Sequence, residues 1–250
     1  MAIKINWQDL KKRFVGSQEI VRVYKAWVQV RPDSPFDDYF WFTNAGTINQ
    51  MIFLRYTWWG SAPAQSDWPN LEYSFDKETW TDYTITGWSS YIEGPNIILT
   101  PWQKVYRRSK STTPTTFATA RLEYWTFEST SGSKFYAWWD LTSLICKTGG
   151  DTLSRYCFSN LFSGLRLLSI PKLTATTLGS HCYDYLFDNT NARLDTTQHW
   201  EFQYPFRLPY VWTISWESPI FVRMFKTDDA TCPVISPQLN TTYYCTVPTY

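Results

Sequence analysis

Asp151-Thr-Leu-Ser-Arg-Tyr-Cys-Phe-Ser-Asn-Leu-Phe162 is followed, 25 residues later, by Thr176-Thr-Leu-Gly-Ser-His-Cys-Tyr-Asp-Tyr-Leu-Phe187. The apolar positions that recur include Leu153, Cys157 and Leu161 in the first copy and Leu178, Cys182 and Leu186 in the second. A constant period in the twenties is typical of stacked coils, in which each coil adds a short strand and buries its apolar row against the next. We therefore expect these side chains to form the core of a short repeat.

The sequence at residues 170–187 resembles the repeat of BspA-like leucine-rich-repeat proteins, found on gut bacterial surfaces and in the tail and fibre proteins of their phages. Residues 71–83 are similar to the hairpin that often precedes such repeats, and residues 143–150 to the usual lead-in. The resemblance implies a leucine-rich-repeat-like section and an adhesive or structural role without reaction chemistry.

The cysteines favour buried thiols over bonded ones. Cys157 and Cys182 hold equivalent places on adjacent coils and are expected to stack as small buried groups, with a disulfide or metal pair as the alternative. Cys146, Cys232 and Cys245 show no CxxC spacing and no nearby histidine that would complete a zinc site. We expect no metal and no cofactor. The opening residues show no cleavable signal peptide, which favours synthesis in a reducing cytoplasm.

The composition indicates a mainly β protein. The chain has 250 residues with 23 basic and 22 acidic side chains, a balance that gives no reason to expect nucleic-acid binding or attraction to a membrane surface. Its apolar stretches are too short to cross a bilayer, so no membrane insertion is expected. The 15 Trp, 17 Tyr and 16 Phe residues favour strands over helices.

The N-terminal segment, residues 1–35, is predicted to be a helix followed by a hairpin. Trp7, Leu10 and Phe14 lie on one side of the expected helix, and residues 19–31 alternate apolar and polar around a tight connection. The segment resembles the leader of phage virion proteins. This resemblance implies that Trp7, Leu10 and Phe14 dock the protein onto the particle; an ordinary helix and hairpin covering a β core is the alternative.

Tryptophan stands where related turns place glycine. Gly is expected in the connection at Trp27 and in the turn near Trp102, and tryptophan tolerates positive φ poorly. Glycine is also scarce, with 10 residues. Either these turns are built in another way, or the encoding genome reads a codon in a non-standard way, and the sequence leaves both alternatives open.

Residues 36–140 are predicted to form a β-sandwich-like domain, because short alternating segments are separated by turn-forming clusters. The predicted strands are 39–43, 51–56, 71–75, 79–85, 97–100, 104–108, 122–127 and 135–139. Residues 141–250 are predicted to hold the repeat-like section and a C-terminal β cap. Strands expected in residues 200–225 would close the open end of the coils.

Catalysis finds little support in the sequence. His181 falls on the expected coil surface, His199 is isolated, and no GxSxG, Walker, GxGxxG or HExxH string occurs. Acidic pairs are adjacent, as in Asp37-Asp38, which points them apart on a strand. We expect no enzyme, although two distant carboxylates of a glycoside hydrolase stay an open alternative.

Abundant tryptophan suggests a contact surface. Trp58, Trp59 and Trp88 are candidates for contact with a sugar or a partner, since a flat aromatic ring can stack on a pyranose. A sugar-binding module would leave one or two rings in a groove, whereas an assembly protein would carry a broad aromatic patch that is covered in its oligomer.

These observations predict a phage virion structural protein of tail, fibre or head-decoration type, assembled in the cytoplasm of a bacterial host. The expected partners are other virion proteins and copies of the same chain, with a host surface glycan as a further candidate. The alternative is a bacterial surface adhesin or carbohydrate-binding module.

Overall fold

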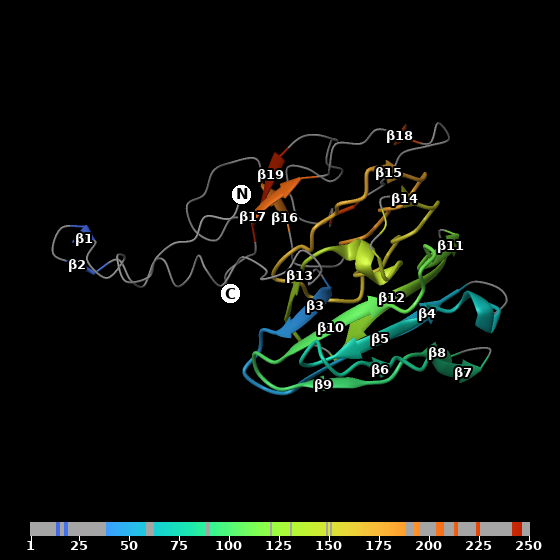
Figure 1. Cartoon of the computed structure of the whole chain (residues 1–250), viewed down its shortest axis with the longest axis horizontal. Helices are drawn as coiled ribbons and strands as arrows, with labels where there is room; N and C mark the ends of the chain where they lie inside the picture. The colour runs from blue at the N-terminus through green and yellow to red at the C-terminus, as the bar shows by residue number, and fades with distance from the viewer. Residues whose placement is uncertain are drawn as a thin grey trace. The chain divides into compact units, whose positions relative to one another are not determined.

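The computed structural model describes residues 14–15, 18–19, 39–58, 63–88, 91–120, 122–130, 132–148, 150, 152–188, 193–195, 204–207, 213–214, 224–225 and 242–246. The chain forms two compact units, Met1–Asp38 and Tyr39–Tyr250. Helical structure in the described residues is limited to two 3-10 turns, η1 (Gln65–Asp67) and η2 (Leu141–Leu144). Strands make up the other regular structure, so the predicted mainly β fold class is confirmed (Figure 1).

The described part of the first unit is a strand pair. β1 (Phe14–Val15) lies antiparallel to β2 (Gln18–Glu19), with Phe14 opposite Glu19. The prediction that Phe14 lies on a helix is wrong, because a residue paired across a strand ladder does not adopt the i to i−4 bonding of an α-helix. Trp7, Leu10 and residues 20–31 of the predicted hairpin lie outside the described residues.

The sandwich part of the second unit consists of two antiparallel sheets (Figure 1). The first has the order β13–β3–β10–β5–β6, and the second has the order β11–β12–β4–β8–β7, with β9 paired to β4. The first sheet consists of β3 (Phe40–Asn44), β5 (Leu71–Ser74), β6 (Thr81–Asp82), β10 (Lys104–Ser109) and β13 (Phe135–Trp138). The second consists of β4 (Gln50–Thr57), β7 (Thr86–Trp88), β8 (Tyr91–Glu93), β9 (Ile97–Leu99), β11 (Ala118–Ala120) and β12 (Glu123–Ser129).

The two sheets pack face to face through aromatic side chains. Phe40 and Phe42 of β3 contact Phe127 of β12, with ring centroids 6.4 and 5.0 Å apart. All three side chains are completely buried. Side chains alternate between the two surfaces of a strand, so the residue between the two phenylalanines, Trp41, belongs to the outer surface. The arrangement agrees with the predicted β-sandwich-like section.

The 25-residue repeat in the sequence corresponds to parallel strand pairing in the structure. β14 (Thr152–Leu153) lies beside β15 (Thr177–Leu178), with Leu153 opposite Leu178. β18 (Thr213–Ile214) continues this sheet on the other side of β15. The predicted 25-residue register is therefore present in the structure. The assignment of the coils to the leucine-rich-repeat class stays a prediction.

Aromatic rings stack from one coil to the next. The largest row is Phe127, Phe162, Phe187 and Phe225, whose successive ring centroids are 5.9, 5.6 and 5.3 Å apart. The amide of Phe162 donates to the carbonyl of Leu186 over 3.1 Å, so backbone bonds follow the same register. Because Phe127 also belongs to the sandwich, the coil stack and the sandwich share one core.

The two coils repeat the same backbone turns. Tyr156 and His181, which are equivalent positions, both have a φ of 58°, and their rings stack with centroids 5.0 Å apart. Asn160 and Tyr185 form a second equivalent pair, with φ values of 59° and 54°. The repeat therefore extends to local conformation, including positions where the side chains differ.

The described C-terminal strands form a separate small sheet. It has the order β16 (Arg193–Asp195), β19 (Thr242–Thr246), β17 (Tyr204–Arg207), and both pairings are antiparallel. β17 and β18 agree with the expectation of further strands in residues 200–225, whereas β16 and β19 lie outside that range. Their role as a cap stays a prediction.

Trp102 occupies a turn that favours glycine. Its φ is 64°, in the left-handed region, and its side chain is 66% exposed. A non-glycine residue in this region loses about 1–2 kcal/mol through the clash of its Cβ with the backbone. Trp102 therefore adopts the left-handed conformation that glycine favours, and a turn that avoids positive φ is excluded at this position. The other alternative, a codon read in a non-standard way, stays open there. Trp27 lies outside the described residues.

Candidate interaction surface

The outer surface of the first sheet is aromatic. Trp41 of β3 lies opposite Tyr106 of β10 on one side and Trp138 of β13 on the other. Tyr136 shares the outer surface with Trp138, because it lies two residues earlier on the same strand. These four side chains are partly exposed, and Trp102 beside them is mostly exposed. We call Trp41, Trp102, Tyr106, Tyr136 and Trp138 the aromatic face.

The rings of the aromatic face lie against one another in a row. Trp102 stacks on Tyr136 with centroids 6.3 Å apart, and Tyr136 stacks on Trp138 at 6.4 Å. Trp138 is followed by Trp41 at 6.1 Å, and Trp41 by Tyr106 at 6.3 Å in an edge-on arrangement. Each ring therefore has a ring neighbour within the row.

Two lysines extend over these rings. The Nζ of Lys104 lies 4.4 Å from the ring centroid of Trp41, and that of Lys77 lies 5.1 Å from the centroid of Tyr106. Desolvation lowers the pKa of Lys104 below its usual value, and the nearby charge of Lys77 lowers this pKa further. Each cation–π contact contributes about 0.5–1 kcal/mol at an exposed site. The two lysines therefore cover part of the ring surface of Trp41 and Tyr106.

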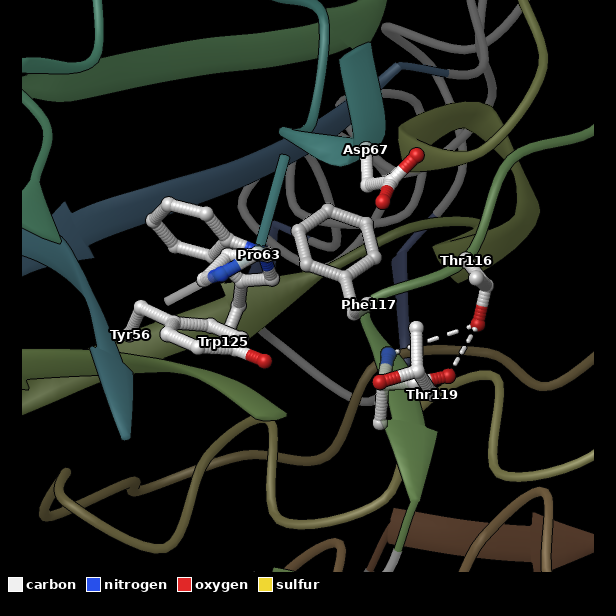
Figure 2. A pocket seen from close by; sticks show the side chains of 8 residues that line it. Tyr56, Pro63, Asp67, Thr116, Phe117, Thr119 and Trp125 are labelled. Atoms are coloured by element: carbon white, nitrogen blue, oxygen red, sulfur yellow. Dashed lines mark hydrogen bonds between the residues drawn. The ribbon is translucent and has the colours of Figure 1, made fainter. Parts of the chain in front are cut away.

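A shallow pocket lies elsewhere in the sandwich, where β4, β11 and β12 meet (Figure 2). Its cavity volume is about 10 Å³, which is about the space that one water molecule needs. Its lining combines aromatic walls with a carboxylate and two threonine hydroxyls, and consists of Tyr56, Pro63, Asp67, Thr116, Phe117, Ala118, Thr119 and Trp125. Pro63 and Asp67 come from the segment around η1, Tyr56 from β4 and Trp125 from β12, and the others from β11 and the two residues before it.

The predicted contact tryptophans fall near this pocket only in part. Trp58 is partly buried, and its ring stacks on Tyr56 with centroids 5.6 Å apart. Trp88 ends β7, and its side chain is not described; Trp59 lies outside the described residues. Of the predicted docking residues, only Phe14 is described, in β1. Among the predicted contact and docking residues, Trp58 is the one whose side chain the structure describes.

The residues predicted for the repeat core are all buried: Leu153, Cys157, Leu161, Leu178, Cys182 and Leu186. Cys146, Cys157 and Cys182 are free thiols. Burial raises the pKa of Cys157 to about 12 and raises that of Cys182 well above its usual value. Thiols held in the neutral form are poor nucleophiles and poor metal ligands, so these cysteines serve packing. Within the described ranges, no group of three or more His, Cys, Asp or Glu side chains is placed to hold a metal ion.

Sequence reasoning missed the aromatic face, although its signal was present. Trp41, Tyr106, Tyr136 and Trp138 all fall in predicted strands, at alternating positions. Alternation assigns such residues to one surface of a strand, but it does not tell which surface another sheet covers.

Comparisons with protein-family models, curated proteins and solved structures found no match to this chain. In the part of the chain that the structure describes, no helix has the length and apolar character needed to span a membrane.

Proposed function

We propose that this chain is a phage virion structural protein, of tail, fibre or head-decoration type, that acts by protein–protein contact. The observation that carries the proposal is the aromatic face. Aromatic residues are enriched at the centres of protein interfaces, where large rings contribute disproportionately to binding. A row of such rings on the outer side of a sheet suits contact with another subunit, and we propose copies of the same chain and other virion proteins as the partners.

The ring geometry favours protein contact over sugar binding. A pyranose stacks on the open flat side of a ring, whereas Lys104 lies over one side of the Trp41 ring, and each ring from Trp102 to Tyr106 has another ring of the row 6.1 to 6.4 Å away. A protein partner needs no open ring side, because it gains from burying the edges of the whole row.

The coil stack supports the same proposal. Its ring stacking and backbone hydrogen bonds continue directly from the sandwich. Such continuity suits a rigid scaffold more than an enzyme whose parts move during catalysis. We propose that the stack is a short leucine-rich-repeat-like section, in keeping with the resemblance of residues 170–187, and that residues 200–225 cap it.

Light scattering on the purified full chain tests the proposal. We expect an oligomer that dissociates in the double variant Trp41→Thr with Tyr106→Thr, in which threonine preserves the strand preference. The matched control is Tyr91→Thr, which removes an aromatic ring that is 51% exposed on the other sheet. A monomeric wild-type chain, or equal dissociation in the control, would contradict assembly through the aromatic face.

The docking segment has its own test. Deleting residues 1–31 is expected to leave a folded protein that no longer joins its assembly, measured by circular dichroism and by co-sedimentation with the other virion proteins. Loss of folding would show that the segment belongs to the core.

One observation favours a second candidate, a carbohydrate-binding module of an adhesin. Trp102 ends the row and is 66% exposed, so one side of its ring is accessible for a sugar. A glycan array separates the candidates, since a defined sugar bound by a monomer, and lost in Trp102→Thr, would favour the adhesin.

A further inference from the structure

The connections β3–β4 and β9–β10 lie together at one end of the sandwich (Figure 1). Asn44, the last residue of β3, joins them and is completely buried. Its side-chain amide donates to the carbonyls of Ile48 and Leu99, each over 2.8 Å. Its backbone carbonyl accepts a hydrogen bond from the amide of Trp102 over 2.9 Å. Both connections are therefore held in place by the core of the sheet.

Large apolar side chains are exposed at this end. Ile48 and Trp102, which belong to the two connections, are 70% and 66% exposed. Ile98 of β9 is 61% exposed, and Phe75, directly after β5, is 45% exposed. β5 ends at the same end of its sheet, because it runs antiparallel to β10, which begins there. Among the described residues, these are four of the six large apolar side chains that are exposed.

Trp102 is strained as well as exposed. Its φ of 64° lies in the left-handed region, where a Cβ clashes with the backbone. Burial does not compensate for this strain, since the side chain is mostly exposed. Backbone strain of this kind is concentrated at functional positions, so the ring is a candidate for contact with something outside the chain.

Three lysines surround the apolar side chains. Lys104 begins β10, Lys77 lies in the turn after β5, and Lys134 lies in the β12–β13 connection. The carbonyl of Lys134 accepts a hydrogen bond from the amide at the start of the β3–β4 connection over 2.9 Å, so it belongs to the same end. The acidic residues of these connections are Asp76 and Glu78, and the Asp76 carboxylate is occupied by amides of its own turn. The remaining charge at this end is positive.

We propose that this end of the sandwich docks onto an anionic lipid bilayer. Ile48, Ile98 and Trp102 would enter the boundary between headgroups and acyl chains, where tryptophan is enriched and apolar side chains of peripheral proteins are buried. The lysines would contact the lipid phosphates, and each lysine near an anionic surface adds to the attraction. The inference goes beyond the proposed function, which concerns contacts with other proteins.

The distribution of the apolar side chains favours a bilayer over a protein partner. They come from separate connections and strand ends, and the residues between them are mainly Thr, Ser, Asn, Gln and Gly. A stable protein interface buries about 800 Å² on each partner around a continuous apolar centre. A fluid bilayer needs no matching shape, so it can bury separate apolar tips at the same time.

Flotation of the purified full chain with lipid vesicles tests the proposal. The vesicles consist of phosphatidylcholine alone or of phosphatidylcholine and phosphatidylglycerol in equal parts. We expect binding to the mixed vesicles, and binding at least about tenfold weaker to phosphatidylcholine alone, because the lysines then lose their anionic partners. High salt should weaken the binding to mixed vesicles. A chain that does not float with the mixed vesicles, or that binds both kinds equally, would overturn the proposal.

The double variant Ile48→Asn with Lys134→Gln should weaken binding to the mixed vesicles at least about tenfold. Neither residue belongs to the aromatic face, so the oligomeric state should not change. The matched control is Leu122→Asn with Lys147→Gln, which makes comparable changes at exposed positions elsewhere and should bind as the wild type does. Equal loss in the control would contradict docking through this end.

Ile48→Asn alone distinguishes insertion from a simple anion site, with glycerol phosphate as the soluble probe. Vesicle binding that is unchanged in Ile48→Asn, or that glycerol phosphate abolishes, would mean that the lysines bind phosphate without insertion, and the proposal would be wrong. An oligomer that dissociates in Ile48→Asn would assign this end to a protein contact and overturn the proposal as well. A monomeric wild type that floats with the mixed vesicles would contradict assembly through the aromatic face and support docking to lipid.

Discussion

The sandwich holds its strands in long antiparallel ladders, whereas the coil stack uses strands of two residues. β4 (Gln50–Thr57) pairs with β12 along six successive residues, while β14 and β15 pair only through Thr152–Leu153 and Thr177–Leu178. In the coils, apolar rows replace the ladder, with rings and aliphatic side chains in register from turn to turn. Stability in the coils should therefore depend on single core side chains more than stability in the sandwich does.

The two regions also differ in whether their buried charged side chains have a polar partner. In the coils, the Asp184 side chain is 1% exposed and its carboxylate lies 2.6 Å from His181. In the sandwich, Arg107 is completely buried, and all three of its guanidinium nitrogens lack a hydrogen-bond partner. It is surrounded by the rings of Tyr83, Phe127 and Phe42, at 4.6, 4.8 and 5.8 Å. Ring contacts offset only part of the cost of burying a charge.

Phe162 joins the two regions, and its truncation should have the largest effect. Its ring lies 5.9 Å from Phe127 of the sandwich and 5.6 Å from Phe187 of the next coil. Phe162→Ala should lower the free energy of unfolding by about 3–5 kcal/mol through lost burial and a cavity. Urea denaturation followed by circular dichroism measures this, and the transition should stay single because the core is shared.

Phe162→Leu is the control for this prediction. It retains most of the apolar volume and should cost less than about 1.5 kcal/mol. Two separate transitions in Phe162→Ala, one for each region, would show that the coils and the sandwich unfold independently.

Arg107 gives a prediction of opposite sign in the sandwich. Arg107→Met should raise the free energy of unfolding by about 1–4 kcal/mol, because it replaces an unpaired buried charge by an apolar chain of similar length. The urea midpoint measures the change, with Arg108→Met as the control, since Arg108 is paired with Glu72 and is expected to lose stability. A lower midpoint for Arg107→Met would mean that its ring contacts outweigh desolvation.

The sequence predicts the strands of the sandwich well and the short ones poorly. Every strand predicted between residues 39 and 139 overlaps an observed strand, because alternation over five or more residues is a local signal. β7 (Thr86–Trp88), β8 (Tyr91–Glu93) and β11 (Ala118–Ala120) were missed, whereas β9, which also has three residues, was predicted; strands this short show no dependable period. In β7, Gly87 has a φ of 145° and lies so close to Tyr91 that a Cβ would clash with its backbone.

The sites were harder to predict than the strands. Leu153 and Leu178 could be placed together because their relation is a repeat within the sequence. The aromatic face and the pocket depend on which strands become neighbours: Trp41 and Tyr106 are distant in sequence, and so are Asp67 and Trp125. Such pairings follow from the packing of the whole sandwich, so no local pattern reveals them.

Trp102 tests whether local strain matters beside these packing effects. Trp102→Gly should stabilise the chain by about 1 kcal/mol, because glycine adopts a φ of 64° without a Cβ clash. Trp102→Ala removes the same ring but keeps the Cβ, so it separates relief of backbone strain from loss of the ring contact with Tyr136. We expect the glycine variant to melt above the alanine variant in thermal denaturation; equal melting temperatures would refute the strain.

The smallest expected effect concerns the turn after β5, where one carboxylate organises the backbone. Asp76 Oδ1 accepts hydrogen bonds from the amides of Glu78 and Thr79, each over 2.8 Å, and from the hydroxyl of Ser74. The backbone bond from Thr79 is the main reason that the pKa of Asp76 is lowered to about 2. Because this pKa is below that of the unfolded chain, near 3.9, the carboxylate adds stability above pH 4, and that stability is lost as the pH falls toward 2. Asp76→Asn keeps the acceptor oxygen but not the charge, so its melting temperature should match that of the wild type at pH 2 and fall slightly below it at pH 5. A difference that stays constant across this range would assign the effect to the shape of the turn and not to its charge, leaving the sandwich, like the coils, governed by packing.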